Sequence, residues 1–230
     1  MDGQINQPNN QQENVTAEVK TQEQAAKPEV QVNFPAEDTR PSRPFAYRYR
    51  GVILAIAAIV LLIFPPADLT IVPFLIFINV MIIAVYLRIR ARQAIGDHSR
   101  RTTQDAPVLV TWGAYGRMRH PLYVSNIAIA VAIVVLHLGI SWLLIPFFVF
   151  VYAFGVYLSK LDDHYLEKRY GDEWRLWAMH TNPFIPREIH VPGPICSAKQ
   201  AIISDMYTWI WLALVIGLML FRKIDFILWA

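Results

Sequence analysis

The sequence has little charge and almost no cysteine. Charged residues make up only 17% of the 230 residues, whereas 55% are hydrophobic. A water-soluble domain of this length carries more charge, so the apolar surplus must face something other than water. The single cysteine, Cys196, excludes an internal disulfide framework and any zinc or iron–sulfur site built from several cysteines. We predict a polytopic membrane protein without a metal site.

Charge is absent from four long stretches. Apart from His137, which we take as neutral, they are residues 51–67, 69–87, 121–159 and 206–221. As a single helix, the 39-residue stretch 121–159 would measure roughly 58 Å, about twice the hydrocarbon thickness of a bilayer. It must therefore cross twice, and His137, Gly139 and Ser141 near its middle place the turn there.

The predicted fold is all-α, a polytopic membrane helical bundle with about five transmembrane helices. The spans are expected at about 45–64, at 70–88, twice within 121–159, and at 206–221. The fourth is expected to continue as a cytosolic helical extension to Tyr170, with Gly171 as its C-terminal cap. Arg222 and Lys223 would lie outside if the last segment crosses once, which conflicts with the positive-inside rule. A re-entrant or interfacial placement of that segment stays open.

Positive charge flanks the apolar stretches. Residues 44–230 carry seventeen bases and eleven acids, a net charge of +6. Arginines precede the first span and follow the second: Arg40, Arg43, Arg48, Arg50, Arg88, Arg90, Arg92, Arg100 and Arg101. The positive-inside rule then places the N-terminus and this linker in the cytoplasm. We expect a multi-pass integral membrane protein, in the cell inner membrane if the source is bacterial, with the lipid bilayer and no nucleic acid as partner.

A polar cluster is predicted where the two helices of 121–159 reach the cytoplasm. With the turn near residue 140, antiparallel packing places Arg119, His120 and Tyr123 at the level of Asp162 and Asp163. Polar groups at the end of an apolar span, partly shielded from water, are functional candidates.

Each of these residues also has a structural interpretation. Arg119 alone is typical of a topology anchor, and Tyr123 of an aromatic at the membrane interface. Asp162 and Asp163 could form a solvated helix face, and Pro121 could simply begin a helix. The convergence of all of them at one depth favours function.

The chemistry of this cluster suits a small zwitterion with an additional positive charge. Unpaired amides at the start of the helix after His120, together with Arg119, favour a carboxylate. Asp162 favours an ammonium or sulfonium group, and rings such as Tyr115 and Trp177 can cover a cation or an adenine. S-adenosylmethionine carries all of these groups.

Two blocks of the sequence resemble a known family. The first is Leu109-Val110-Thr111-Trp112-Gly113-Ala114-Tyr115 followed by Arg119-His120-Pro121-Leu122-Tyr123. The second is Asp162-Asp163-x-x-Leu166-x-x-x-Tyr170-Gly171-x-x-Trp174-x-x-Trp177, followed by Phe184-Ile185-Pro186. In this order and spacing they are similar to motifs of the isoprenylcysteine carboxyl methyltransferase and phospholipid methyltransferase family of integral membrane enzymes. The resemblance covers residues 75–188.

The resemblance implies an S-adenosylmethionine-dependent methyltransferase with a lipid-like or small apolar acceptor that arrives from the bilayer. The implied cofactor-binding residues are Leu109, Val110, Tyr115, Arg119, His120, Pro121, Leu122, Tyr123 and Asp162, with backbone help from the 107–110 stretch. If the acceptor is an amine or a thiol, it needs a base, for which His120 and Asp163 are the catalytic candidates, with His164 a further possibility.

The sequence also departs from the family pattern. Asp162 stands where the family has a glutamate, and Trp174 and Trp177 replace tyrosines. Leu158 stands where prenylcysteine methyltransferases have an arginine thought to engage the substrate carboxylate. These departures disfavour a prenylcysteine substrate and leave the acceptor open.

Two other functions fit parts of the sequence. Lys168-Arg169-Tyr170-Gly171-Asp172-Glu173-Trp174 is similar to a segment of NADPH-dependent sterol and steroid reductases, although the tract after Pro121 lacks their asparagine, glycine and acid. A non-catalytic membrane scaffold derived from the methyltransferase fold is the third interpretation.

Four segments follow from these patterns. Residues 1–43 are predicted to be a disordered polar tail, because they lack the apolar residues needed to bury a core. The tail is a candidate binding segment for an unknown partner. Residues 44–101 would form a transmembrane hairpin and basic cytoplasmic linker, 102–190 a methyltransferase-like core with the cofactor site, and 191–230 a C-terminal transmembrane segment.

Overall fold

The computed structural model describes residues 45–68, 70–96, 108–188 and 191–229, which form helices and connecting loops with no strand among them. The chain divides into two units, Met1–Thr39 and Arg40–Ala230, and every described residue lies in the second. The predicted disordered tail lies outside the described residues. So do Arg40, Arg43, Arg100, Arg101 and Pro107.

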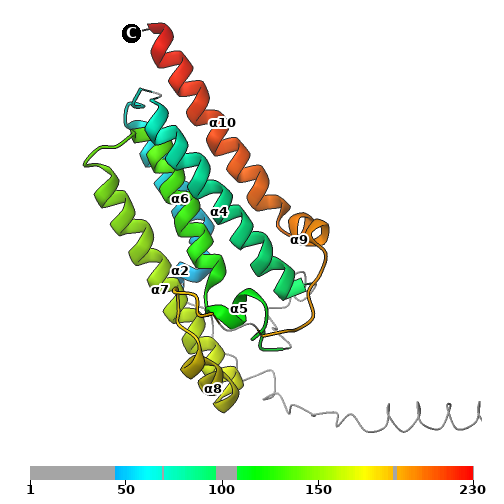
Figure 1. Ribbon diagram of the computed structural model, residues 1–230. Helices are drawn as coiled ribbons and strands as arrows, with labels where there is room; N and C mark the ends of the chain where they lie inside the picture. Colours follow the sequence, from blue (N-terminus) through cyan, green and yellow to red (C-terminus); the bar gives the residue numbers. More distant parts are fainter. Residues whose placement is uncertain (1–44, 69, 97–107, 189–190, 230) are drawn as a thin grey trace, which may run out of the picture. The chain divides into compact units, whose positions relative to one another are not determined.

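Four helices in the described part of the chain are long and apolar enough to cross a membrane (Figure 1). They are α4 (Ile71–Ile95), α6 (Pro121–Leu138), α7 (Leu144–Tyr170) and α10 (Met206–Trp229), the last meeting this criterion over Met206–Ile224. The prediction of an all-helical membrane bundle is confirmed in this form.

The first predicted span is divided into two helices. α2 (Phe45–Arg48) is a single turn, and α3 (Arg50–Ile63) has 14 residues. At 1.5 Å per residue α3 is about 21 Å long, shorter than the roughly 30 Å of bilayer hydrocarbon. It ends before Pro65-Pro66, because proline rings cannot continue a helix and disfavour helical backbone before them. A fifth span over residues 45–64 therefore stays a prediction.

Two helices run further than the sequence predicted. The second uncharged stretch ends at Leu87, but α4 continues through three arginines to Ile95, where Gly96 ends it with φ 58°. Alanine, arginine and glutamine are strong helix formers, so the helix does not stop where hydrophobicity falls. α10 likewise continues past residue 221 to Trp229.

The predicted hairpin of residues 121–170 is confirmed. α6 ends at Leu138 and α7 begins at Leu144, with Gly139 in a left-handed conformation (φ 62°) at the turn. α7 ends at Tyr170 with Gly171 as its C-cap, as predicted, and Gly171 has a positive φ of 53°, which glycine adopts without steric cost. The turn is fixed to the α3–α4 loop, because the amide of Ala67 donates to the carbonyl of His137 at 2.8 Å.

α4 and α6 pack closely through small residues. The Ser125 hydroxyl donates to the carbonyl of Ala84 at 2.9 Å, and Ser125, Ala84 and Ala132 are all fully or almost fully buried. Small side chains at a helix interface let two backbones approach. α7 lies along α6 (Figure 1). Asp205, directly before α10, contacts Arg92 of α4.

The shorter helices gather at one end of this bundle. α5 (Ala114–Arg117), α8 (Asp172–His180) and α9 (Ala198–Ser204) lie at the end opposite the α6–α7 turn (Figure 1). This is the end at which both sequence blocks meet.

Candidate functional site

A cavity of about 860 Å³ opens among α3, α4, α6, α7 and α10 and the segment before α5. This volume lies within the range of small-molecule sites. Eight of the nine predicted cofactor-binding residues line it: Leu109, Val110, Tyr115, Arg119, His120, Leu122, Tyr123 and Asp162. The structure therefore brings residues of both blocks to one cavity.

Two predicted site residues do not line this cavity. Pro121 is fully buried and begins α6 at its first helical position, where its missing N–H costs no hydrogen bond. Asp163 lies behind His120, with its carboxylate against the imidazole. Their proposed roles, cofactor binding and catalysis, stay predictions.

The predicted meeting of α6 and α7 side chains is confirmed. The Tyr123 hydroxyl donates to Oδ2 of Asp162 at 2.6 Å. His120 Nε2 lies 3.0 Å from Oδ1 of Asp163, and an Nη atom of Arg119 lies 3.8 Å from the other oxygen of the same carboxylate. The two adjacent aspartates thus have different partners, since successive residues on a helix point about 100° apart.

The backbone at the start of α6 differs from the prediction of unpaired amides. The Arg119 amide donates to the carbonyl of Asn182 at 2.9 Å, and the His120 amide donates to the carbonyl of Pro183 at 3.0 Å. These two amides precede the helix. In its first turn, the amides of Tyr123 and Val124 both donate to the carbonyl of His120 at 3.1 Å, so the prediction of unpaired amides is wrong for Tyr123 and Val124. The guanidinium of Arg119 stays the predicted donor for a ligand carboxylate at this end of the cavity.

Residues 181–188 and 191–197, here called the strap, connect α8 to α9 and hold the first sequence block in place. The amide of Arg187 donates to the carbonyl of Arg117, and the amide of Gly113 to the carbonyl of Val191. The indole N–H of Trp112 donates to the carbonyl of Pro194 at 2.6 Å. The backbone before α6 is therefore positioned by a segment more than 60 residues later in the chain.

Replacement of Gly193 with alanine is expected to disturb this strap. A Cβ atom there would lie 2.2 Å from Cγ of Trp112, and 2.5 Å from its Cβ. Overpacking of this kind costs roughly 1–3 kcal/mol, so Gly193→Ala should lower the unfolding temperature of the detergent-solubilised protein. Gly217→Ala is the control, because nothing lies within 4 Å of its added methyl group. Equal unfolding temperatures for the two variants would contradict this account of the strap.

Tryptophans from α8 close one side of the site. Trp177 lines the cavity and donates its indole N–H to the carbonyl of Tyr115 at 3.1 Å. The ring of Trp174 lies 5.8 Å from the guanidinium carbon of Arg119, a cation–π distance. Trp174 and Trp177 thus both contact residues of the first block.

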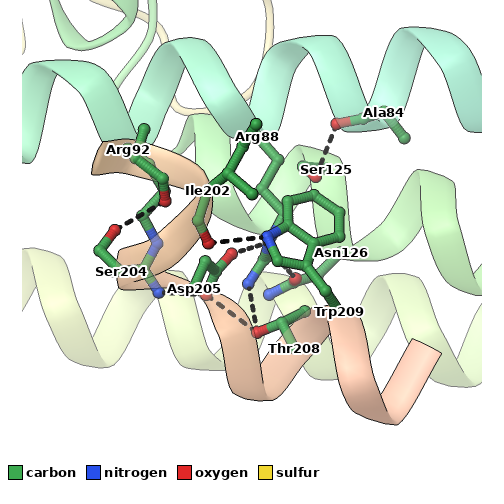
Figure 2. A network of polar contacts seen from close by, with 11 residues as sticks. Ala84, Arg88, Arg92, Ser125, Asn126, Ile202, Ser204, Asp205, Thr208 and Trp209 are labelled. Carbon is green, nitrogen blue, oxygen red and sulfur yellow. Dashed lines mark hydrogen bonds and ion pairs between the residues drawn. The ribbon is translucent and has the colours of Figure 1, made fainter. Parts of the chain in front are cut away.

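A second polar group lines the cavity, and the sequence pattern does not mark it as a site. Arg88 and Arg92 on α4, Asn126 on α6 and Thr208 on α10 contribute to the wall. Figure 2 shows them gathered around Asp205, which comes directly before α10. By their place after an apolar stretch, the two arginines are typical of topology anchors. The one feature of the sequence that could indicate this cluster is Asp205, an acidic residue directly before an uncharged stretch.

Searches of protein-family models, curated proteins and solved structures found no match for this chain. Within the described ranges, no group of three or more His, Cys, Asp and Glu side chains could hold a metal ion.

Proposed function

We propose that this protein transfers a methyl group from S-adenosylmethionine to a lipid-like or small apolar acceptor within the membrane. The observation that carries the proposal is the single cavity shared by the two blocks, one around residues 109–123 and the other beginning at Asp162. These blocks are about 40 residues apart and contain the residues that resemble a methyltransferase.

The residues of this part of the cavity fit S-adenosylmethionine by their chemistry. The Asp162 carboxylate suits a cationic group, and the guanidinium of Arg119 suits a carboxylate. Tyr115, Tyr123 and Trp177 provide aromatic surface for an adenine or a sulfonium. The hydrogen bond from Tyr123 fixes the orientation of Asp162, so the carboxylate is already positioned before a ligand binds.

S-adenosylmethionine would supply an electrophilic methyl group: the acceptor forms a bond to this carbon, and the sulfur keeps the electrons of the bond that breaks. The protein positions the two reactants and limits the access of water. Its largest contribution is orientation, because helices α6 and α7 hold the lining side chains on rigid backbone.

The other part of the cavity is suited to an apolar acceptor. Val52, Leu54 and Ala55 of α3 and Trp211 and Val215 of α10 line it. Both helices also expose large apolar side chains on their outer faces, as lipid-contacting helices do. An acceptor dissolved in the bilayer can therefore meet the methyl donor without crossing water.

His120 is the proposed base for an acceptor that loses a proton. Its Nε2 atom contacts the carboxylate of Asp163 at 3.0 Å, which fixes Nε2 as the protonated nitrogen. Nδ1 can then accept the proton, while Asp163 orients the ring. A carboxylate acceptor would need no base.

The proposal includes a topology. Five spans, with residues 45–64 as the first, would place the cavity, α5 and α8 on the cytoplasmic side, where S-adenosylmethionine is made available. In a bacterium this would be the cell inner membrane. Arginines at positions 88, 90 and 92 at the same end of the bundle support this orientation.

Calorimetric titration of the detergent-solubilised protein tests the proposal. S-adenosylmethionine should bind with heat that saturates at one equivalent, and NADPH should produce no saturable signal. The comparison separates a methyltransferase from a reductase. Binding of NADPH with no binding of S-adenosylmethionine would overturn the proposal.

A further inference from the structure

The polar cluster around Asp205 joins three helices inside the cavity wall. Arg88 donates through Nε to Asp205, through Nη1 to Oδ1 of Asn126 at 2.5 Å, and through Nη2 to the hydroxyl of Thr208 at 3.0 Å (Figure 2). Arg92 donates through Nη2 to Oδ1 of Asp205 at 2.7 Å. All three nitrogens of Arg88 are occupied, whereas Arg92 uses only one.

This cluster has two positive charges and one negative charge, so it keeps a net charge of +1. Two guanidinium groups share the single carboxylate of Asp205, and neither pairs with another carboxylate of the described chain. The side chains of Arg88 and Asp205 are only 6% and 3% exposed, and that of Arg92 is 20% exposed. Burial of a charge without a counterion is costly, so a bound anion would stabilise this arrangement.

The unused donors belong to Arg92. Its Nε atom is buried and has no hydrogen-bond partner among the described residues. Arg92 also lines the cavity, together with Arg50, Arg88 and Arg119, whereas Asp162 is the only acid in the described lining. The cavity wall is therefore electropositive on the α4 side.

The surroundings of this charge are apolar. Ile95 of α4, Leu54 and Ala55 of α3, and Trp211 and Val215 of α10 line the same cavity. A small hydrated anion would gain nothing from these side chains, whereas an anionic group carried on an alkyl chain would satisfy both the charge and the apolar wall.

We propose that the α4–α10 side of the cavity binds an amphiphile whose head group carries a single negative charge, with Arg92 as the residue that contacts it. The head group forms charge-assisted hydrogen bonds with the Nη donors of Arg92 that do not contact Asp205. Arg88 is a positioning residue, because its bonds to Asp205, Asn126 and Thr208 hold the cluster together. The apolar wall is the one assigned above to the methyl acceptor, but this binding does not rest on methyl transfer, since it requires no methyl donor.

Three probes distinguish the contribution of the negative charge to binding from that of the alkyl chain. Each is titrated calorimetrically into the full-length protein in a non-ionic detergent, without S-adenosylmethionine. Dodecanoate carries both features, dodecanol has the chain without the charge, and acetate has the charge without the chain. Dodecanoate should bind at least about tenfold more tightly than dodecanol, since a charge-assisted hydrogen bond is typically worth a factor of this size. It should also bind at least about tenfold more tightly than acetate, which lacks the alkyl chain that is buried against the apolar wall.

Arg92→Gln should weaken dodecanoate binding by about tenfold and leave dodecanol unchanged. Arg90→Gln is the matched control, because Arg90 lies on the same helix, is exposed and does not line the cavity. Arg92→Lys keeps the charge and should retain most of the affinity, which keeps the test valid if Arg92→Gln fails to fold. Photo-cross-linking of an azido-labelled dodecanoate to the unmodified protein should label α4 or α10.

Three results would overturn the proposal. They are dodecanol binding as tightly as dodecanoate, acetate binding as tightly as dodecanoate, and dodecanoate binding unchanged in a folded Arg92→Gln variant. Because methyl donor is absent from every sample, these results leave the proposed methyl transfer untouched. Failure of methyl transfer would likewise leave this binding intact.

Discussion

S-adenosylmethionine is expected to bind the Asp162→Asn variant roughly ten- to a hundredfold more weakly than the unmodified protein. Asparagine keeps the shape of the side chain and an oxygen that can accept from Tyr123, but it carries no charge. A hydrogen bond or contact with a charged partner contributes roughly 1.5–3 kcal/mol, which corresponds to this loss of affinity. Calorimetric titration in detergent measures the change directly.

Asp172→Asn is the control for this substitution. Asp172 begins α8, its side chain is 90% exposed, and it does not line the cavity. Its variant should bind S-adenosylmethionine as the unmodified protein does. If Asp162→Asn also retained full affinity while remaining folded, Asp162 would not contact the methyl donor.

The second large effect is expected on stability. Asp205→Ala should destabilise the folded protein by about 3–5 kcal/mol, because it removes the carboxylate shared by Arg88 and Arg92 and leaves the buried guanidinium of Arg88 and the part-buried one of Arg92 without a counterion. Within this cluster, the hydrogen bond from Arg88 to Thr208 would remain as the contact between α4 and α10. Thermal unfolding in detergent, followed by circular dichroism, measures the loss, and Asp172→Ala should unfold at the temperature of the unmodified protein.

The same carboxylate gives the protein a pH-dependent contribution to stability. Burial alone would raise the pKa of Asp205, but hydrogen bonds and charge from Arg88, Arg92 and Thr208 outweigh it and hold this pKa below the ordinary value of 3.8. The contribution is therefore fully present above the ordinary pKa and is lost as pH falls through the lowered one. Below pH 4 the unfolding temperatures of the unmodified protein and of Asp205→Asn should converge. A difference that stays constant with pH would contradict this assignment.

The α6–α7 hairpin could be predicted because its determinants are local. An uncharged stretch of 39 residues is too long for one crossing, and Gly139 and Gly171 mark a turn and a helix end. Both helices rise equally per residue, which sets their antiparallel register. This register predicts that His120 lies at the level of Asp163. In the structure the two side chains are in contact.

The other half of the cavity could not be predicted because its contacts join distant segments. Arg88 and Asp205 are 117 residues apart, and no periodicity connects them. Arginine after an apolar stretch is usually a topology anchor, so its burial among α4, α6 and α10 leaves no trace in the local sequence. The strap could not be predicted for the same reason. The amides of Arg119 and His120 donate to the carbonyls of Asn182 and Pro183, which lie far away in the sequence.

The end of a helix is also poorly marked by hydrophobicity alone. α4 continues to Ile95 because its arginines, alanines and glutamine favour helix as strongly as the apolar residues before them. This extension brings Arg92 to the cavity wall. A boundary drawn at the last apolar residue therefore leaves a cavity-lining residue outside the helix.

Methyl transfer itself is tested most directly with S-adenosylmethionine that carries a radiolabelled methyl group. The purified protein is incubated with this donor and a total lipid extract, and the organic phase is separated and counted. The account predicts labelled lipid-soluble product with the unmodified protein and at least about tenfold less with Asp162→Asn at the same donor concentration. No label in the organic phase with the unmodified protein, or equal label with the folded variant, would contradict it.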